Sequence, residues 1–310
     1  MKIVFLGTPV YAAACLEALL RSRHEVLAIC TQPDKASGRG NKMTPSAVKE
    51  LALAHCLPCH QPKRIKSPKS LAELAAYGAD IFITAAYGQI LNQDMLDLPR
   101  LGCINVHASL LPNYRGASPI QQAIINGDSI TGVTIMQMDT GIDTGDILLQ
   151  HEIPITNDDT GGSLHDKLCL KAPLALLEAL DLLEAGKIIR TPQNSAKATH
   201  APIIEKEMGR INWQQTAPEI CQKIRAFDPW PGSYTLLDGG TIKIWSAVPS
   251  VAQNSGQPGK ILQASPKDGL HVACGDSSVQ ILEIQPQGGR RMKAKEYLRG
   301  RALTAGSIFA

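Results

Sequence analysis

Residues 104–116 read INVHASLLPNYRG, which begins as an apolar strand and ends as a proline-bearing loop. Side chains alternate between the two faces of a strand, so Asn105 and His107 lie on the same face, and Ser109 follows them if the strand continues. An asparagine amide can donate a hydrogen bond to a developing oxyanion, and a histidine can donate one or move a proton. A core histidine and a loop-capping amide are the ordinary alternatives. The stretch predicts a strand whose carboxyl end carries chemistry.

The rest of the first 150 residues alternates short apolar runs with helical stretches. We expect strands at 2–7, 25–31, 57–61, 79–87, 103–108 and 132–138, and helices at 9–21, 45–54 and 70–77, with another after Ser118 and Pro119. Continuously apolar strands in a β-α-β rhythm are typical of a parallel sheet covered on both faces. We therefore predict a Rossmann-like, doubly wound, mostly parallel α/β domain. Open sheets of this kind bind ligands at the carboxyl ends of their strands, where Asn105 and His107 fall.

The second half of the chain has a different pattern. Residues 163–187 have helical apolar spacing, but Pro173 predicts a break or a kink there. Residues 189–206 are polar and contain proline, which is typical of a linker. Beyond them, short apolar runs separated by Gly, Pro and Asp turns predict a small antiparallel, OB-like β-barrel. The expected organisation is a catalytic domain at 1–188, a linker at 189–206 and a barrel domain at 207–310.

Charge is unevenly divided along the chain. Up to residue 189 there are 16 Lys and Arg against 19 Asp and Glu, and from residue 190 there are 15 against 9. A basic second half favours a polyanionic partner such as nucleic acid, although a solvated basic face is the alternative. No apolar run is long enough to span a bilayer and no leader peptide is evident, so we expect a cytoplasmic protein without membrane contact. We also expect a monomer.

A carboxylate near His107 would orient its ring. The segment MQMDTGIDTGD, residues 136–146, offers Asp139, Asp143 and Asp146, and spacing alone does not choose among them. Other motifs carry less. The G-x-G-x-x-G fingerprint is absent, which disfavours a nicotinamide-dependent oxidoreductase that would use Asp34 on a ribose. The sequence CLPCH at 56–60 matches a haem attachment motif, but that use requires export. We expect no metal.

The residues quoted above resemble the folate-dependent formyltransferase family. The resemblance rests on NVHASLLPNYRG and MQMDTGIDTGD, together with FLGTP at 5–9, TQPDKASGRG at 31–40, AAYGQIL at 85–91, RAFDPWPGSY at 225–234 and IQPQGG at 284–289. It covers nearly the whole chain. It implies transfer of a formyl group from 10-formyltetrahydrofolate to the free amine of methionine carried by initiator tRNA.

Residue by residue, the resemblance implies three groups of site residues. It makes Asn105, His107 and Asp143 the catalytic trio, and so selects Asp143 among the aspartates. The folate site implied by SLLP and AAYGQIL comprises Ser109, Leu110, Leu111, Pro112, Ala86, Tyr87, Gly88, Gln89 and Ile90. The tRNA contacts are expected at Arg39, with Lys35 and Lys42 as weaker candidates, and along a basic track of Lys206, Arg290, Arg291, Lys293 and Lys295.

Two departures from the commoner family sequence weaken two expectations: the stiffness of the loop after the second strand, and a tRNA contact at position 203. Ala36 and Ser37 stand where Pro and Ala are usual, and Ile203 stands where a lysine is frequent. Two other functions remain open: formylation of a small amine, such as a sugar amine or glycinamide ribonucleotide, and tRNA binding without catalysis. The basic second half and RAFDPWPGSY favour tRNA, and the intact trio favours catalysis.

Overall fold

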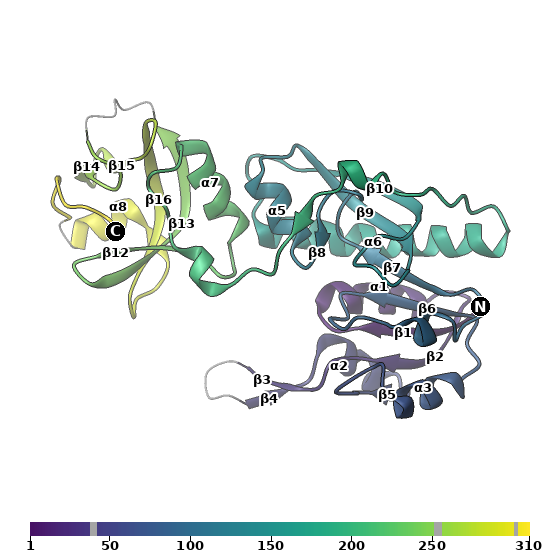
Figure 1. Cartoon of the computed structure of the whole chain (residues 1–310). Helices are drawn as coiled ribbons and strands as arrows, with labels where there is room; N and C mark the ends of the chain where they lie inside the picture. The colour runs from purple at the N-terminus through teal and green to yellow at the C-terminus, as the bar shows by residue number, and fades with distance from the viewer. Residues whose placement is uncertain (38–41, 251–255, 301–302) are drawn as a thin grey trace. The chain divides into compact units, whose positions relative to one another are not determined.

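The structure is a computed structural model that describes residues 1–37, 42–250, 256–300 and 303–310 (Figure 1). The chain forms two compact units. Unit 1 comprises Met1–Pro119, Ile130–Pro154 and His165–Ala201, and unit 2 comprises Ile120–Ser129, Ile155–Leu164 and Pro202–Ala310. The expected linker at 189–206 is thereby divided, because 189–201 group with unit 1 and 202–206 with unit 2. The domain boundaries at 188 and 207 stay predictions.

Unit 1 is built on a seven-stranded sheet with the order β10-β9-β7-β6-β1-β2-β5. Its parallel part consists of β1 (Lys2–Gly7), β2 (Glu25–Cys30), β5 (Cys59–His60), β6 (Ile81–Ala85) and β7 (Cys103–His107). Two strands run antiparallel at one edge, β9 (Ile130–Gln137) beside β7 and β10 (Ile147–Pro154) beside β9. The predicted mostly parallel α/β fold is confirmed.

Helices cover both faces of this sheet. Val4, Leu6 and Phe82 pack with residues of α3 (Pro68–Ala75) and α4 (Gln93–Leu96). The alternate residues Ile3 and Phe5 face the other side and are equally buried. The remaining helices of unit 1 are α1 (Val10–Leu20), α2 (Ala47–Ala54) and most of α6 (Gly161–Glu184).

Caps decide where the short helices begin. The Ser46 hydroxyl accepts a hydrogen bond from the Lys49 amide, so α2 begins at Ala47, two residues later than expected. The Ser67 hydroxyl accepts one from the Ser70 amide, so α3 begins at Pro68, two residues earlier than expected.

The connection after β2 forms a hairpin of β3 (Lys35–Ser37) and β4 (Lys42–Thr44), which the sequence did not predict. Arg39 lies outside the described residues, and Lys42 is described by its backbone alone.

Helix α6 is continuous over 24 residues with Pro173 inside it (Figure 1). Of the two alternatives expected at Pro173, the break is therefore wrong, and the kink stays a prediction. Leu168, Ala172, Leu176 and Leu180 are fully buried at helical spacing, and Pro173 lies beside this stripe, half-buried. The packing of the stripe holds the helix together although proline removes a backbone donor. No helix of the described ranges has the length and apolarity needed to cross a membrane.

Unit 2 contains a six-stranded antiparallel sheet with the order β12-β13-β16-β15-β14, and β17 pairs with β16. The strands are β12 (Ser233–Leu237), β13 (Gly240–Ser250), β14 (Ile261–Ser265), β15 (Gly269–Ala273), β16 (Ser278–Pro286) and β17 (Met292–Lys293). Its helices are α7 (Ala217–Ala226), α8 (Ala294–Gly300), the short η2 (Lys206–Gly209) and α5 (Pro119–Ile125) from Ile120 onward. Trp213 and Phe309 stack in its core. The predicted separate antiparallel domain is confirmed.

Replacing Pro173 by alanine should stabilise unit 1. The change restores one backbone donor and removes the ring from the helix interior, which outweighs the greater freedom of the unfolded chain, so the free energy of unfolding should rise by about 1–2 kcal/mol. Urea unfolding followed by circular dichroism measures this. The matched control is Leu174→Ala, an exposed neighbour, with a change within about 0.5 kcal/mol. A lower midpoint for Pro173→Ala than for the wild type would contradict the expectation.

Candidate active site

Asn105, His107 and Asp143 converge at the carboxyl end of β7. Asn105 and His107 are in register with Met136 and Thr134 of β9, and Asp143 lies in the connection from β9 to β10. The Asn105 Nδ2 atom is 3.3 Å from Asp143 Oδ1, and the His107 Nδ1 atom is 3.6 Å from Asp143 Oδ2. The sheet therefore brings together an amide donor, an imidazole and a carboxylate.

A threonine fixes the orientation of the Asn105 amide. The Thr84 hydroxyl, at the end of β6, donates to Asn105 Oδ1 at 2.8 Å. Thr84 is directly in register with Asn105 and is buried. Because Oδ1 accepts from Thr84, the Nδ2 donor points to the side where Asp143 lies. Asn105 is thus presented to the site as a hydrogen-bond donor.

The two ring nitrogens of His107 have different partners. Nε2 lies 2.9 Å from the backbone carbonyl oxygen of Tyr114, which can only accept, so Nε2 carries a hydrogen. In the neutral ring Nδ1 is then the nitrogen with the lone pair, and it faces Asp143. Nδ1 is therefore the atom left to accept a proton, and it becomes a donor only after it has taken one up.

The Asp143 carboxylate is held from several directions. Oδ2 accepts from the backbone amide of Gly116 at 2.9 Å, in addition to the contacts with Asn105 and His107. The residue has φ +53°, in the left-handed region that few residues other than glycine, asparagine and aspartate adopt. Asp139, by contrast, caps its own turn by accepting from the Gly141 amide and the Thr144 hydroxyl.

Hydrogen bonds within the loop after β7, and from the loop to β9, hold its shape. The Ser109 hydroxyl donates to the Asn113 carbonyl at 2.6 Å, and Ser109 is fully buried. The Thr134 hydroxyl donates to the Ser109 carbonyl and accepts from the Leu111 amide. Ser109 and Leu111 are therefore occupied in holding the loop, whereas Leu110 and Pro112 are half-buried.

The loop after β6 lies where the strand order reverses, between β1 and β6. The Tyr87 carbonyl accepts from the Thr8 hydroxyl and from Gln32 Nε2, which ties the loops after β1, β2 and β6 together. The Gln89 side chain is used within the protein: its Oε1 accepts from the Ile65 amide and its Nε2 donates to the Pro62 carbonyl.

The residues of this loop differ in exposure. Burial raises the pKa of the Tyr87 phenol, which therefore stays neutral. Ala86, Gly88 and Ile90 are exposed, and Ile90 is 64% accessible, so ordinary core packing does not describe it.

The Asp34 carboxylate after β2 is bound within unit 1, which disfavours its use on the ribose of a dinucleotide. It accepts from Lys49 Nζ at 2.6 Å and from Gln61 Nε2 at 2.7 Å, and the hydrogen bond from Lys49 lowers its pKa. Both carboxylate oxygens are thus used within unit 1.

The basic residues predicted in unit 2 divide into two kinds. Lys206, Arg290 and Lys293 are exposed. Arg291 is paired instead, with Asp228 Oδ2 at 2.9 Å and Glu283 Oε2 at 2.7 Å, and its guanidinium lies 5.0 Å from the ring centroid of Trp245.

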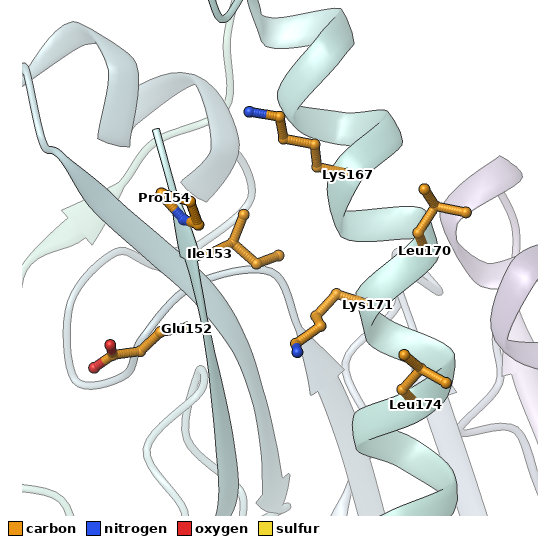
Figure 2. Close-up of a pocket in the computed structure, with 7 residues that line it drawn as sticks. All are labelled: Glu152, Ile153, Pro154, Lys167, Leu170, Lys171 and Leu174. Atoms are coloured by element: carbon orange, nitrogen blue, oxygen red, sulfur yellow. The ribbon is translucent and has the colours of Figure 1, made fainter. Parts of the chain in front are cut away.

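Two further features lie away from the trio. A groove of about 280 Å³ lies between β10 and α6. Figure 2 draws the residues that line it, Glu152, Ile153, Pro154, Lys167, Leu170, Lys171 and Leu174. None of the predicted site residues lines it.

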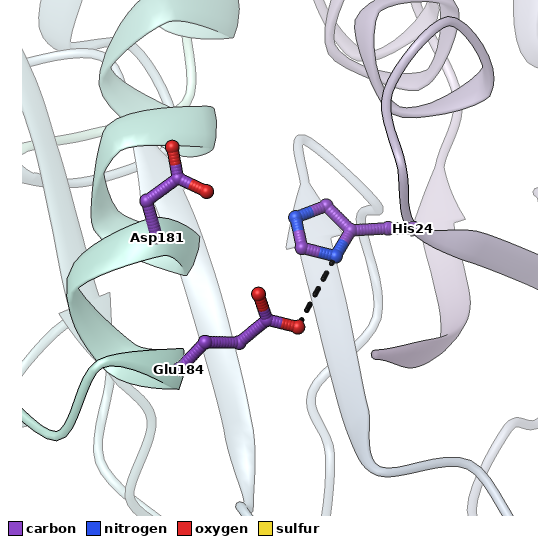
Figure 3. A group of neighbouring side chains, drawn as sticks. All are labelled: His24, Asp181 and Glu184. Carbon is purple, nitrogen blue, oxygen red and sulfur yellow. Dashed lines mark ion pairs between the residues drawn. The ribbon is translucent and has the colours of Figure 1, made fainter.

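The second feature, drawn in Figure 3, groups His24, Asp181 and Glu184, which are close enough to hold an ion. Arg23 donates to both carboxylates, and the ammonium of Met1 donates to Glu184, whose pKa it lowers. The carboxylates are therefore already neutralised by cations of the chain, and the cluster does not fit a metal site.

A doubly wound sheet that brings an amide, an imidazole and a carboxylate together at the end of a strand carries the kinds of group that an acyl transfer would use. Family models identify the class of acyl group: the model "Formyl transferase" matches residues 1–180, and "Formyl transferase, C-terminal domain" matches 203–302. The chain belongs to the formyl transferase family and is a formyl-transferring enzyme.

Several curated relatives resemble the chain over its full length. The methionyl-tRNA formyltransferase of Agathobacter rectalis is 45% identical over 309 residues, which are 100% of this chain and 99% of the relative. The methionyl-tRNA formyltransferase of Pseudomonas entomophila is 47% identical over 301 residues, which are 97% and 96% of the two chains.

Solved structures of lower identity share the fold. HypX from Aquifex aeolicus, in complex with tetrahydrofolic acid, is 21% identical with a TM-score of 0.62, over 96% of this chain and 47% of that one. WlaRD, a sugar 3N-formyl transferase in the presence of dTDP and 5-N-formyl-THF, is 19% identical with a TM-score of 0.67, over 94% and 99%.

Sequence reasoning missed several residues that hold the site. Thr84 was visible as a polar residue in an apolar strand, but only the register between β6 and β7 places it against Asn105. Gln193, whose Nε2 donates to the backbone carbonyls of Asp143 and Gly145, gave no signal, because it lies in a polar stretch without periodicity.

Replacing Arg291 by alanine should weaken unit 2. Asp228, 9% exposed, would lose its cationic partner and Trp245 its cover, so the free energy of unfolding should fall by about 1–2 kcal/mol. Arg290→Ala, one residue away and exposed, is the control, with an expected change within about 0.5 kcal/mol. Equal denaturation midpoints for the two variants would show that the Arg291 pairs contribute nothing measurable.

Proposed function

We propose that the protein transfers the formyl group of 10-formyltetrahydrofolate to the amino group of methionine esterified to initiator tRNA. The observation that carries the proposal is the identity of 43–48% with methionyl-tRNA formyltransferases over at least 97% of this chain. The convergent trio supports it independently, because it supplies the groups that such a transfer requires. We place the reaction in the cytoplasm, and the monomeric state stays a prediction.

The reaction forms one C–N bond and breaks another. The neutral amine of the methionyl group attacks the formyl carbon, and negative charge builds up on the formyl oxygen. The bond from that carbon to N10 of the folate then breaks, N10 takes up a proton, and the attacking nitrogen loses one. The enzyme has to stabilise the oxyanion and move a proton.

Asn105 and His107 are proposed to stabilise the oxyanion. Thr84 holds the amide with Nδ2 outward, and Nδ1 of a charged His107 ring lies on the side of Asp143. Asp143 orients the ring and helps a water molecule relay the proton that leaves the amine. Donors fixed before the reaction need no reorganisation when the charge develops.

The folate is proposed to bind along the carboxyl edge between β1 and β6. Ala86, Gly88 and Ile90 are exposed there, and the loop carries backbone groups that can pair with a pterin edge. Ile90 offers an apolar wall, and Pro112 and Leu110 offer another. Tyr87, Gln89, Ser109 and Leu111 contribute by holding the two loops in shape.

The tRNA is proposed to contact exposed basic residues. Lys206, Arg290 and Lys293 have the exposure that phosphate contacts require. Lys42, the first residue of β4, and Arg39, which lies outside the described residues, are proposed on the family resemblance alone. Arg291 would act mainly by organising the surface near Trp245, since Asp228 and Glu283 already pair with it.

Asn105→Ala and His107→Ala should lose turnover far more than substrate affinity. Removal of one oxyanion donor typically lowers kcat by roughly 10²- to 10³-fold. Steady-state formylation of charged initiator tRNA measures both constants, and His55→Ala, an exposed histidine at the end of α2, is the control. A raised KM with unchanged kcat would reject the assignment.

The same assay, run with an amino sugar nucleotide or glycinamide ribonucleotide in place of tRNA, tests the acceptor. A higher kcat/KM with either small amine than with charged tRNA would replace the proposed substrate.

Arg290→Ala should weaken tRNA binding in a salt-dependent way. One lost phosphate contact reduces the slope of log affinity against log salt by about 1. Filter binding or anisotropy across a salt series measures the slope, and Arg21→Ala, exposed on unit 1, is the control. An unchanged slope would remove Arg290 from the interface.

A further inference from the structure

The segment from Thr191 to Ala201 contacts both loops of the active site. Thr191 exchanges two backbone hydrogen bonds with Ile147, at the start of β10. Further along, β11 (His200–Ala201) pairs with β8 (Arg115–Gly116), directly after the catalytic loop that follows β7. We call residues 191–201 the strap.

Within the strap, Gln193 forms hydrogen bonds directly with the turn that carries Asp143. Its Nε2 donates to the backbone carbonyls of Asp143 and Gly145, at 2.9 Å and 2.7 Å. Its Oε1 accepts from Nε and Nη2 of Arg115, at 3.0 Å and 2.8 Å, and Arg115 is buried. One side chain therefore joins the loop of Asp143 to the loop after His107.

The chemistry of the partners dictates which end of the Gln193 amide points where. Arginine has only donors and backbone carbonyls only accept, so the oxygen must face Arg115 and the NH2 group must face the turn. Glutamine is long enough to span the two loops and has both functions without a charge. A carboxylate of the same size would keep the acceptor and lose the donor.

The turn at Asp143 is held from both sides. Asp143 has φ +53°, in the left-handed region that aspartate visits only occasionally. The other side of the turn is packed tightly, because a Cβ added at Gly145 would lie 1.9 Å from the Gln137 carbonyl oxygen. The turn is thus held between β9 and Gln193, and these contacts set the direction in which the Asp143 carboxylate points.

The strap reaches His107 as well. The Thr199 hydroxyl accepts from the Tyr114 amide at 2.9 Å, and the Tyr114 carbonyl is the partner of His107 Nε2. Tyr114 has φ +62°, so this turn is also held in the left-handed region.

We infer that Gln193 is a positioning residue for formyl transfer, which aims the Asp143 carboxylate at His107 and Asn105 by clamping the carbonyls of its turn. The inference rests on the proposed role of Asp143. A misplacement of about 1 Å at a reacting group can lower the rate by 10²-fold, so loss of the clamp lowers kcat without changing what the substrates touch.

Gln193→Glu tests the inference, with Asn194→Asp as the matched control. Both variants add one negative charge at neighbouring positions, and aspartate keeps the oxygen that accepts from the Ala196 amide. Gln193→Glu should lower kcat by roughly 10- to 100-fold, with KM for both substrates within about twofold of the control. Gln193→Met, which removes the donor without adding charge, should lose kcat in the same way. A kcat for both Gln193 variants within about twofold of the control would overturn the inference.

A combination with Asp143→Asn separates positioning from simple loosening of the fold. If Gln193 acts through Asp143, adding Gln193→Glu to Asp143→Asn should change the single-turnover rate by less than about twofold, because the group that it aims is already disabled. A multiplied loss in the double variant would overturn the inference.

The outcomes also distinguish the two proposals. Full activity of Asp143→Asn would refute the proposed role of the trio. Loss of activity in Asp143→Asn with normal kcat in both Gln193 variants would refute the positioning role alone.

Discussion

The geometry of the active site depends on one carboxylate. Asp143 accepts from the Asn105 amide and the Gly116 backbone, and it faces Nδ1 of His107. These partners come from the end of β7 and from β8, whereas Asp143 itself lies in the connection between β9 and β10. Because the sheet register brings the strands together but cannot aim the side chains, the carboxylate supplies the common point of attachment. Asp143 has a left-handed backbone conformation, and its turn is held by β9 on one side and by Gln193 on the other.

The sequence predicted the fold, and the three side chains that it proposed as a catalytic trio lie together in the structure. Continuous apolar strands with intervening helices indicated the parallel sheet, and the alternation along residues 104–108 placed Asn105 and His107 on one face. The choice of Asp143 came from resemblance, and its geometry shows why periodicity could not supply it. Asp139 and Asp143 differ only in which way a glycine-containing turn directs them.

Two features lay beyond sequence reasoning for physical reasons. Proline lowers the stability of an isolated helix, yet a buried stripe keeps α6 continuous through Pro173, because tertiary packing outweighs local propensity. The strap looked like a linker because polar residues without periodicity carry no signal of their partners. Its contacts with Arg115 and Asp143 span 78 and 50 residues of sequence, and only the folded chain makes them.

That separation in sequence has a consequence for synthesis. All strands of the unit 1 sheet precede residue 155, and α6 ends at Glu184, so a nascent chain can assemble the sheet and its helices before Gln193 has left the ribosome. The turns of Asp143 and Tyr114 can form their hydrogen bonds with the strap only after residues up to Ala201 have emerged. A chain that ends before the strap would keep the sequence of the sheet and its helices but would lack the hydrogen bonds that Gln193 and Thr199 make to the turns of Asp143 and Tyr114.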